Sequence, residues 1–303
     1  MTGELMMPHA NDPVEGFLDL PKGKIHYLDW PGRNNRSAHF LHANGFCAGT
    51  YAPFLQNLNE EFRILASDVR GHGDSDPHPL ARVRHWRLFA RDLKHVIEHL
   101  LQPPVIGIGH SLGAVTTYIA AATWPHLFSA IVLIDPVILP PRILNLMRVM
   151  KVLGLIHLVP LARGARRRRR EFESKQAALK RFTSGRGIFK SWSSEFIEAY
   201  LECGLLEADG KGVVLKCDPE LEARIFESAP TDAWRYAKRI QCPALAIRGE
   251  KSDTFQDDAA RRLAEIIPDC TLSVINGTGH FVPMEKPVEC ARLISRFVQQ
   301  HGL

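Results

Sequence analysis

Short apolar runs alternate with segments of helical periodicity along most of the chain. Runs without polar alternation are typical of strands covered on both faces, and they occur at residues 38–42, 62–67, 104–108, 130–135, 244–249 and 270–275. Apolar residues at helical spacing fill the intervals at residues 51–58, 86–101, 259–267 and 287–299. Residues 16–30 alternate loosely about a Pro-Lys-Gly-Lys turn, which predicts a hairpin at a sheet edge. Strands that alternate with helices predict a mostly parallel sheet flanked by helices, an α/β fold.

The alternation stops between about residues 137 and 230. This middle segment has helical periodicity and many basic residues, and it contains no apolar run that predicts a buried strand. The strand and helix pattern resumes at residue 244. We therefore predict one α/β core domain formed by residues 1–137 and 231–303, with a helical cap (lid) inserted at residues 138–230.

The formal net charge of +5 is concentrated in one part of the chain. Residues 161–190 hold eleven Arg and Lys against two Glu, including the run Arg166–Arg170, so the other residues are net acidic. A charge confined to one segment favours a solvated helix face over general affinity for nucleic acid. We expect no nucleic-acid partner, and nothing in the sequence specifies an oligomeric state.

Six cysteines are scattered without a Cys-x-x-Cys pair, which argues against a disulfide framework and against a thiolate zinc site. We expect no metal and no cofactor, and a reducing, cytoplasmic location. Residues 1–8 show no basic segment followed by an apolar run, so we expect no secretory signal. No uncharged apolar run reaches the length of a membrane span.

The first candidate for chemistry is a Gly-x-Ser-x-Gly turn centred on Ser111. It lies between the apolar run at residues 104–108 and the start of a helix. Gly109 and Gly113 permit a sharp turn that exposes the serine hydroxyl, and the free N–H groups of the helix can face a developing negative charge. We predict that Ser111 is a nucleophile.

A serine needs a base, and a histidine base needs a carboxylate to hold its tautomer. Among fourteen histidines, His280 lies on a Gly-rich loop directly after the last predicted strand, at the sheet edge where Ser111 is expected. Asp253 and Asp135 both follow predicted strands. We favour Asp253, because it follows the strand next to the one that leads to His280; Asp135 is the alternative acid, or a turn residue before Pro136.

Taken together, these motifs resemble the α/β-hydrolase superfamily, specifically serine hydrolases of the carboxylesterase type with a helical cap. The matching segments span nearly all of the chain outside the cap; they are His42-Ala43-Asn44-Gly45-Phe46, Asp68-Val69-Arg70-Gly71-His72-Gly73-Asp74-Ser75, Gly109-His110-Ser111-Leu112-Gly113, Asp253 and Gly279-His280. The resemblance implies an oxyanion hole formed by the backbone N–H groups of Leu112 and Phe46. Cys47 replaces the proline that family members usually carry in this loop.

The sequence thus predicts a serine hydrolase with a nucleophile elbow, an oxyanion hole and a catalytic triad. Residues 143–153 form an apolar, amphipathic segment of the cap, which favours an ester or thioester of a small-to-medium hydrophobic substrate. The same triad also serves lactones and carbon–carbon bonds beside a carbonyl, and a non-catalytic ligand receptor is the alternative of another class. The lid segment allows transient membrane contact without stable insertion.

Overall fold

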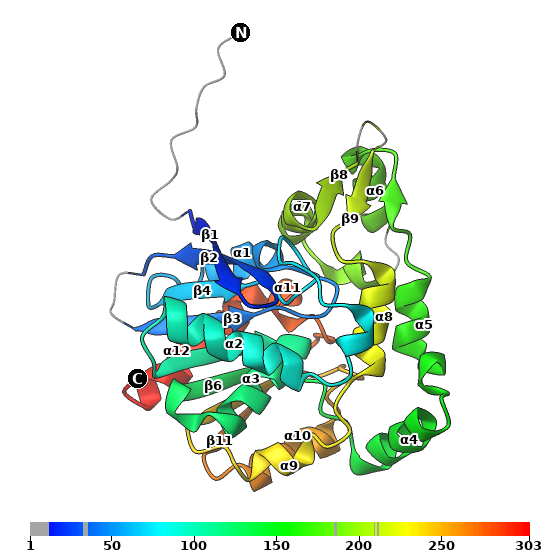
Figure 1. The fold of residues 1–303 in the computed structure, drawn as a ribbon. Coiled ribbons are helices and arrows are strands. Elements are labelled where there is room, and N and C mark those ends of the chain that lie inside the picture. Colours follow the sequence, from blue (N-terminus) through cyan, green and yellow to red (C-terminus); the bar gives the residue numbers. More distant parts are fainter. Residues whose placement is uncertain (1–11, 33–35, 185–186, 209, 211) are drawn as a thin grey trace.

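The computed structural model describes residues 12–32, 36–184, 187–208, 210 and 212–303 (Figure 1). The N-terminal stretch in which we expected no secretory signal lies outside these residues. An eight-stranded sheet with the order β1-β2-β4-β3-β5-β6-β10-β11 forms the centre of the molecule. Its strands are β1 (Val14–Leu20), β2 (Gly23–Trp30), β3 (Ser37–Leu41), β4 (Arg63–Ser67), β5 (Val105–His110), β6 (Phe128–Ile134), β10 (Ala244–Gly249) and β11 (Cys270–Ile275).

Strand β5 lies in the middle of the parallel part of this sheet. The β1–β2 and β2–β4 pairs are antiparallel and every other neighbouring pair is parallel, which confirms both the edge hairpin and the mostly parallel sheet. Gly109 at the end of β5 lies opposite Leu41 of β3 on one side and opposite Leu133 of β6 on the other. The carboxyl ends of three strands therefore meet beside Ser111.

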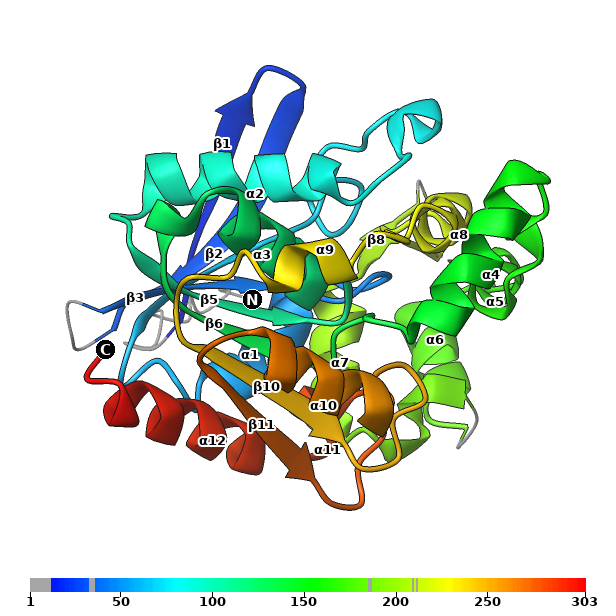
Figure 2. The ribbon, with the colours of Figure 1, turned by 90° about the horizontal axis from the view of Figure 1, so that it is seen from below.

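Helices cover both faces of the sheet, and Figure 2 shows α2 and α12 on opposite sides of it. One apolar layer lies under α2, α3, α9 and α10, and the other lies under α1, α11 and α12. Ile131 and Leu133 face the first layer, while Val132 and Ile134 face the second, as the two-residue period of a strand requires. These helices are α1 (Ala52–Leu55), α2 (Arg87–Leu100), α3 (Leu112–Thr123), α9 (Trp234–Ala237), α10 (Asp257–Ile266), α11 (Val282–Glu285) and α12 (Pro287–Gln300).

The segment that we assign to the cap leaves the sheet after β6 and returns before β10. It holds the helices α4 (Pro141–Val152), α5 (Pro160–Arg166), α6 (Lys175–Phe182), α7 (Ser194–Cys203) and α8 (Pro219–Glu227). Five short 3₁₀ helices complete the described chain: η1 (Ala48–Tyr51), η2 (Leu80–Arg82), η3 (Pro125–Leu127), η4 (Ile156–Leu158) and η5 (Gly187–Ser191). The boundaries at residues 138 and 230 stay our own division of the chain.

The segment predicted as a helical cap also contains short strands, which the sequence pattern did not predict. A three-stranded antiparallel sheet, β7-β9-β8, lies beside α6 and α7 (Figure 1). Its strands are β7 (Glu171–Phe172), β8 (Leu205–Glu207) and β9 (Val213–Leu215). Strands of two or three residues are too short to produce a readable alternation, so pairing with neighbours defines them, not local pattern.

The turn between β5 and α3 depends on close backbone contact at two glycines. A Cβ atom on Gly109 would lie 2.4 Å from the carbonyl carbon of Gly113, and one on Gly113 would lie 2.0 Å from the carbonyl oxygen of Leu41. Both distances are well below van der Waals contact, so α3 starts directly against β5 and the end of β3. This contact fixes the place of Ser111.

We expect Gly113→Ala to destabilise the fold by at least about 2 kcal/mol, since the new methyl group meets immobile backbone. Gly164→Ala in α5 is the matched control, because nothing lies within 4 Å of its Cβ position; it should be neutral or stabilise by about 0.5–1 kcal/mol. Urea unfolding of both variants measures the difference. Equal stability of the two variants would contradict the proposed packing.

Candidate active site

Ser111 occupies a strained turn between β5 and α3. Its backbone has φ 56° and ψ −112°, a region that residues other than glycine seldom adopt. Its amide donates to the carbonyl oxygen of Ile134 at 3.0 Å, which ties the turn to the end of β6. The structure thus places the predicted nucleophile at the carboxyl edge of the sheet.

His280 reaches Ser111 from the loop after β11. Its Nε2 lies 3.0 Å from Oγ of Ser111, and its Nδ1 lies 2.7 Å from Oδ1 of Asp135. A carboxylate accepts, so Nδ1 carries the proton and donates to Asp135, while Nε2 accepts from the serine hydroxyl. This is the arrangement in which an imidazole can remove the hydroxyl proton.

The carboxylate beside His280 is Asp135, so the expectation that Asp253 contacts this histidine is wrong. Asp135 is fully buried and also accepts from the amide of Gly249 at 2.9 Å and from Oγ of Ser252 at 2.6 Å. Asp253 is exposed, and its carboxylate accepts from the hydroxyl of its neighbour Thr254.

The turns after β6 and β10 determine which carboxylate faces His280. After β10 the amide of Ser252 donates to the carbonyl of Gly249, and this tight turn buries Ser252 and leaves Asp253 in solvent. Asp135 follows β6 directly and has φ 42°. Among the described residues, Asp135 and Ser111 are the two that have a positive φ and are not glycine. Asp135 follows its strand immediately, whereas Asp253 lies four residues beyond Gly249. This difference in spacing is the sequence signal that points to Asp135.

The two expected oxyanion donors, the backbone amides of Leu112 and Phe46, differ in whether they already donate a hydrogen bond. Leu112 is the first residue of α3, so its amide belongs to the N–H groups that a helix leaves without internal partners. The amide of Phe46 donates to the carbonyl of Ala43 at 3.3 Å, in a turn whose third residue, Gly45, has φ 84°. That hydrogen bond is long, so the amide of Phe46 can exchange it for a better acceptor.

A hydrogen-bonded pair that sequence reasoning missed connects this loop to His280. Tyr51 Oη accepts from the amide of Ala43 at 3.2 Å and donates to Nδ1 of His110 at 2.7 Å. Nε2 of His110 then donates to the carbonyl of His280 at 2.9 Å. Burial, together with the charge of His280, holds the pKa of His110 well below its usual range, so this ring stays neutral and positions both loops.

Asp68, directly after β4, supports the same loop from below. Its Oδ1 accepts from the amide of Ala48 at 2.6 Å, and its Oδ2 accepts from Nδ1 of His26 at 2.7 Å. Burial alone would raise the pKa of Asp68, but the hydrogen bond and charge of His26 and the charge of His42 lower it overall. The ionised carboxylate thus stabilises the start of η1, next to Phe46.

Asn44 joins the loop to the cap. Its Nδ2 donates to the carbonyl of Glu222 in α8 at 3.0 Å, and its Oδ1 accepts from Nε2 of His72 at 3.1 Å. Burial lowers the pKa of His72 to about 3, so this histidine is neutral and has no part in proton transfer. The Asn44 side chain therefore couples the position of the loop to the position of the cap.

Aromatic side chains from both parts of the chain meet above the site. The Phe46 ring lies 5.3 Å from Trp192, 5.4 Å from Tyr200 and 5.8 Å from Phe281, between ring centroids. Trp192 and Tyr200 belong to the cap, while Phe281 adjoins His280. The Phe281 ring lies 5.1 Å from the His280 ring, between centroids, and Ser111 is only 5% exposed, so this apolar cluster adjoins a site with little access to solvent.

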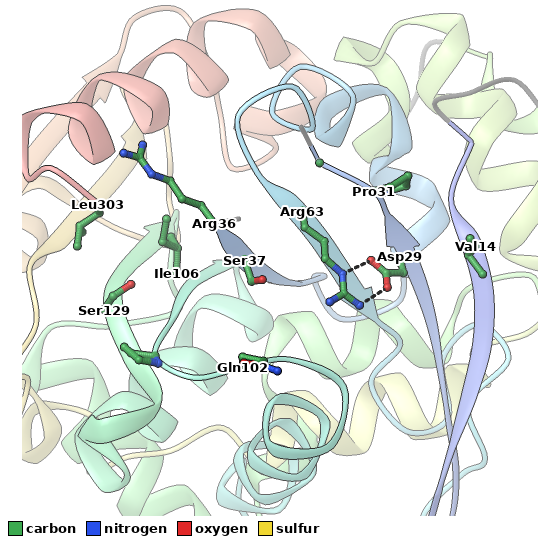
Figure 3. A pocket seen from close by; sticks show the side chains of 12 residues that line it. Val14, Asp29, Pro31, Arg36, Ser37, Arg63, Gln102, Ile106, Ser129 and Leu303 are labelled. Atoms are coloured by element: carbon green, nitrogen blue, oxygen red, sulfur yellow. Dashed lines mark hydrogen bonds and ion pairs between the residues drawn. The ribbon is translucent and has the colours of Figure 1, made fainter. Parts of the chain in front are cut away.

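The large surface pocket in Figure 3 lies at the other end of the sheet. It has a volume of about 780 Å³ and is lined by residues at the starts of strands, including Ser37, Arg63 and Ile106. Figure 3 shows Arg63 directed at Asp29, to which it donates two hydrogen bonds at 3.1 and 2.6 Å. Because Ser111 follows a strand end, this pocket is separate from the candidate active site.

One group within the described part of the chain has the composition of a metal site: Glu15, His26 and Asp74. It lies at the edge hairpin, and the ammonium group of Lys216 already binds Asp74 at 2.6 Å. The Ser111, His280 and Asp135 side chains interact with one another without a contribution from this group.

Comparison with known proteins agrees with this architecture. A model of the family described as alpha/beta hydrolase fold matches residues 38–287. The chain belongs to the α/β-hydrolase family. Membership confirms the resemblance to the α/β-hydrolase superfamily and the α/β-hydrolase fold class, and it makes this chain an enzyme of the hydrolase type.

Named relatives are distant. A 2-(acetamidomethylene)succinate hydrolase of Mesorhizobium japonicum is 24% identical over 275 residues, which cover 86% of each chain. A putative esterase/lipase of Haemophilus influenzae is 26% identical over 80% of this chain and 76% of its own. Among solved structures, the thioesterase domain from the curacin biosynthetic pathway superposes with a TM-score of 0.78 at 19% identity, over 94% of this hydrolase and all of that chain. These likenesses share the fold and differ in the named reaction.

None of the helices in the described part of this hydrolase is both long and apolar enough to cross a membrane.

The two carboxylates give a direct test of the site. We expect Asp135→Asn to lower kcat by about 10⁴-fold, because His280 loses the acceptor that holds its tautomer. Asp253→Asn is the matched control and should leave kcat within about twofold, as an exposed substitution away from the site does. Steady-state kinetics on an ester that the wild type turns over, with thermal unfolding to verify folding, measures both. A large loss in Asp253→Asn with an active Asp135→Asn would reverse the assignment.

Proposed function

We propose that this α/β-hydrolase cleaves a carboxylic ester or thioester of a small-to-medium hydrophobic substrate through an acyl-enzyme on Ser111. The observation that carries the proposal is the continuous set of hydrogen bonds from Ser111 through His280 to Asp135, at 3.0 and 2.7 Å. Side chains in this order raise the reactivity of an alcohol toward a carbonyl group. The elbow holds a serine, which favours acyl transfer over reactions that use an aspartate nucleophile.

The proposed reaction proceeds in two halves. Ser111 Oγ attacks the carbonyl carbon while Nε2 of His280 takes the hydroxyl proton, and Asp135 stabilises the imidazolium that forms. The amides of Leu112 and Phe46 donate to the oxyanion, each contributing about 3 kcal/mol to the transition state. His280 then protonates the leaving alcohol or thiol, and water activated by the same histidine releases the acid from the acyl-enzyme.

The aromatic cover supports a hydrophobic acyl group. Phe46, Trp192 and Phe281 form one aromatic cluster beside His280, and Nε1 of Trp192 is buried without a hydrogen-bond partner among the described residues. An apolar wall with one free donor suits a substrate that carries an apolar chain and a polar atom near it. Lactones and carbon–carbon bonds beside a carbonyl remain the alternative substrates of the same triad.

The outer surface of the cap supports transient contact with a membrane, without insertion. Seven large apolar side chains between residues 146 and 161 are exposed, among them Val152 at 86%; they are Leu146, Val149, Val152, Leu153, Leu155, Leu158 and Leu161. Figure 1 places α4 and α5, which carry four of these seven side chains, at the outer rim of the cap. Arg163 and Arg167 are exposed nearby and have no carboxylate partner in the described chain. Apolar side chains beside cations suit an anionic lipid surface.

Three arginines of the basic run have a structural role in this proposal. Arg166 binds Glu220 and Glu227, Arg168 binds Glu222, and Arg170 binds Asp218. These ion pairs join α5 and its continuation to α8 inside the cap. A cytoplasmic location is supported by the cysteines, all six of which are free thiols.

A fluorophosphonate probe tests the nucleophile. We expect it to label the wild type at Ser111, to leave Ser111→Ala unlabelled, and to label His280→Ala at least about 100-fold more slowly because the base is lost. Ser193→Ala, which changes an exposed serine of the cap, is the control and should label as the wild type does. A panel of esters, thioesters and lactones of increasing acyl length then identifies the substrate class. Labelling that survives Ser111→Ala, or a labelled enzyme without hydrolysis of any panel member, would overturn the proposal.

Flotation with vesicles tests the cap surface. We expect vesicles of phosphatidylglycerol to retain the wild type, and the pair Val152→Asp and Leu153→Asp to bind at least about tenfold less, since two apolar side chains no longer enter the interface. Val288→Asp changes an exposed apolar side chain of α12 and should bind as the wild type does. Absence of wild-type binding, or a stable dimer that buries this face in light scattering, would contradict the membrane contact.

A further inference from the structure

Two cysteines that lie far apart in the sequence meet between the core and the cap. Sγ of Cys47 lies 2.8 Å from Sγ of Cys203, although 156 positions separate them. Cys47 directly follows Phe46 in the loop that carries a proposed oxyanion donor, and Cys203 is the last residue of α7. The two sulfur atoms are about 0.8 Å farther apart than the ~2.0 Å of a disulfide bond.

The surrounding backbone brings these sulfur atoms together. A Cβ atom on Gly49 would lie 2.9 Å from Cβ of Cys203, so η1 and α7 are in direct contact at this point. Thr50 Oγ1 lies 3.3 Å from the sulfur of Cys47 and 3.5 Å from that of Cys203. Packing on both sides therefore holds the pair close without any covalent link.

The two thiols differ in their access to solvent. Cys47 is 2% exposed, and burial raises the pKa of its thiol well above the usual range. Cys203 is partly exposed. The accessible thiol is therefore Cys203, and Cys47 is the second thiol that can resolve its oxidised form.

We propose that Cys47 and Cys203 are an oxidative modification site, at which a peroxide converts the two thiols into a disulfide that joins the cap to the core. The thiolate of Cys203 attacks one oxygen of the peroxide, the O–O bond breaks, and a sulfenic acid forms with release of hydroxide or alkoxide. Sulfur of Cys47 then attacks the sulfenic sulfur and displaces water. In sum, two thiols and hydrogen peroxide give one disulfide and two waters.

The consequence for activity follows from the position of the link and rests on the proposed function. Ser111 is 5% exposed, so movement of the cap away from the core would widen the access of substrate to it. The disulfide would join α7 to the residue next to Phe46 and oppose this separation. The oxidised enzyme should therefore turn over slowly until a thiol reductant restores the pair.

The modification itself is measured on the full chain by mass spectrometry. After treatment with hydrogen peroxide and alkylation of the remaining thiols, we expect a peptide pair joined through Cys47 and Cys203 that dithiothreitol separates. The Tm should rise on oxidation, because the link closes a long loop. Cys203→Ser should lose both effects, and Cys242→Ser is the matched control that should keep them. Absence of the joined peptides, or cross-links to other cysteines in their place, would overturn the proposal whether or not the enzyme hydrolyses esters.

Activity provides a separate readout. We expect kcat/KM on the best ester or thioester to fall at least tenfold on oxidation, to recover with dithiothreitol, and to be insensitive to peroxide in Cys203→Ser. Formation of the joined peptides with unchanged kcat/KM would overturn the regulatory consequence. Loss of activity that persists in Cys203→Ser would assign the effect of peroxide to another group.

Discussion

A single buried carboxylate joins three strand ends at the edge of the sheet. Asp135 follows β6, accepts from Gly249 and Ser252 after β10, and accepts from His280 after β11. An ionised carboxylate without access to water is costly unless several donors surround it. The three donors satisfy this requirement only while the turns keep their shapes, so the orientation of His280 and the packing of the sheet edge stabilise each other.

The proposed oxyanion side of the site depends on the loop after β3. Contacts with three other parts of the chain hold this loop in place. Tyr51 and His110 fix it to the elbow and to His280, Asp68 fixes its far end, and Asn44 fixes it to the cap. The histidine in this set is neutral because burial disfavours its charged form. The loop can thus present backbone amides toward Ser111 without a competing cation. Because the same loop also contacts the cap, a cap movement that opens the site would also shift the backbone amide proposed to stabilise the oxyanion.

Local sequence was sufficient to predict the site residues whose geometry is determined by one short segment. Gly109 and Gly113 around Ser111 admit only a sharp turn between a strand and a helix, and His280 directly follows the last strand, so both places were predictable. Asp135 and Asp253 both follow strands of the sheet, and the difference between them arises in the turn that buries Ser252 and exposes Asp253. The cap strands are defined by pairing between segments, and the approach of Cys47 to Cys203 joins positions 156 residues apart. The pairing of β7 with β9 and the contact between the two cysteines both join segments that no short window of the sequence contains.

A short hydrogen bond from Nδ1–H of His280 to Asp135 organises the site. Proton NMR measures this bond without substrate, since such an imidazole proton resonates far downfield of the amide region. The wild type should show this signal; His280→Ala and Asp135→Asn should abolish it, and Asp253→Asn should retain it. A signal that survives in Asp135→Asn and disappears in Asp253→Asn would contradict the account.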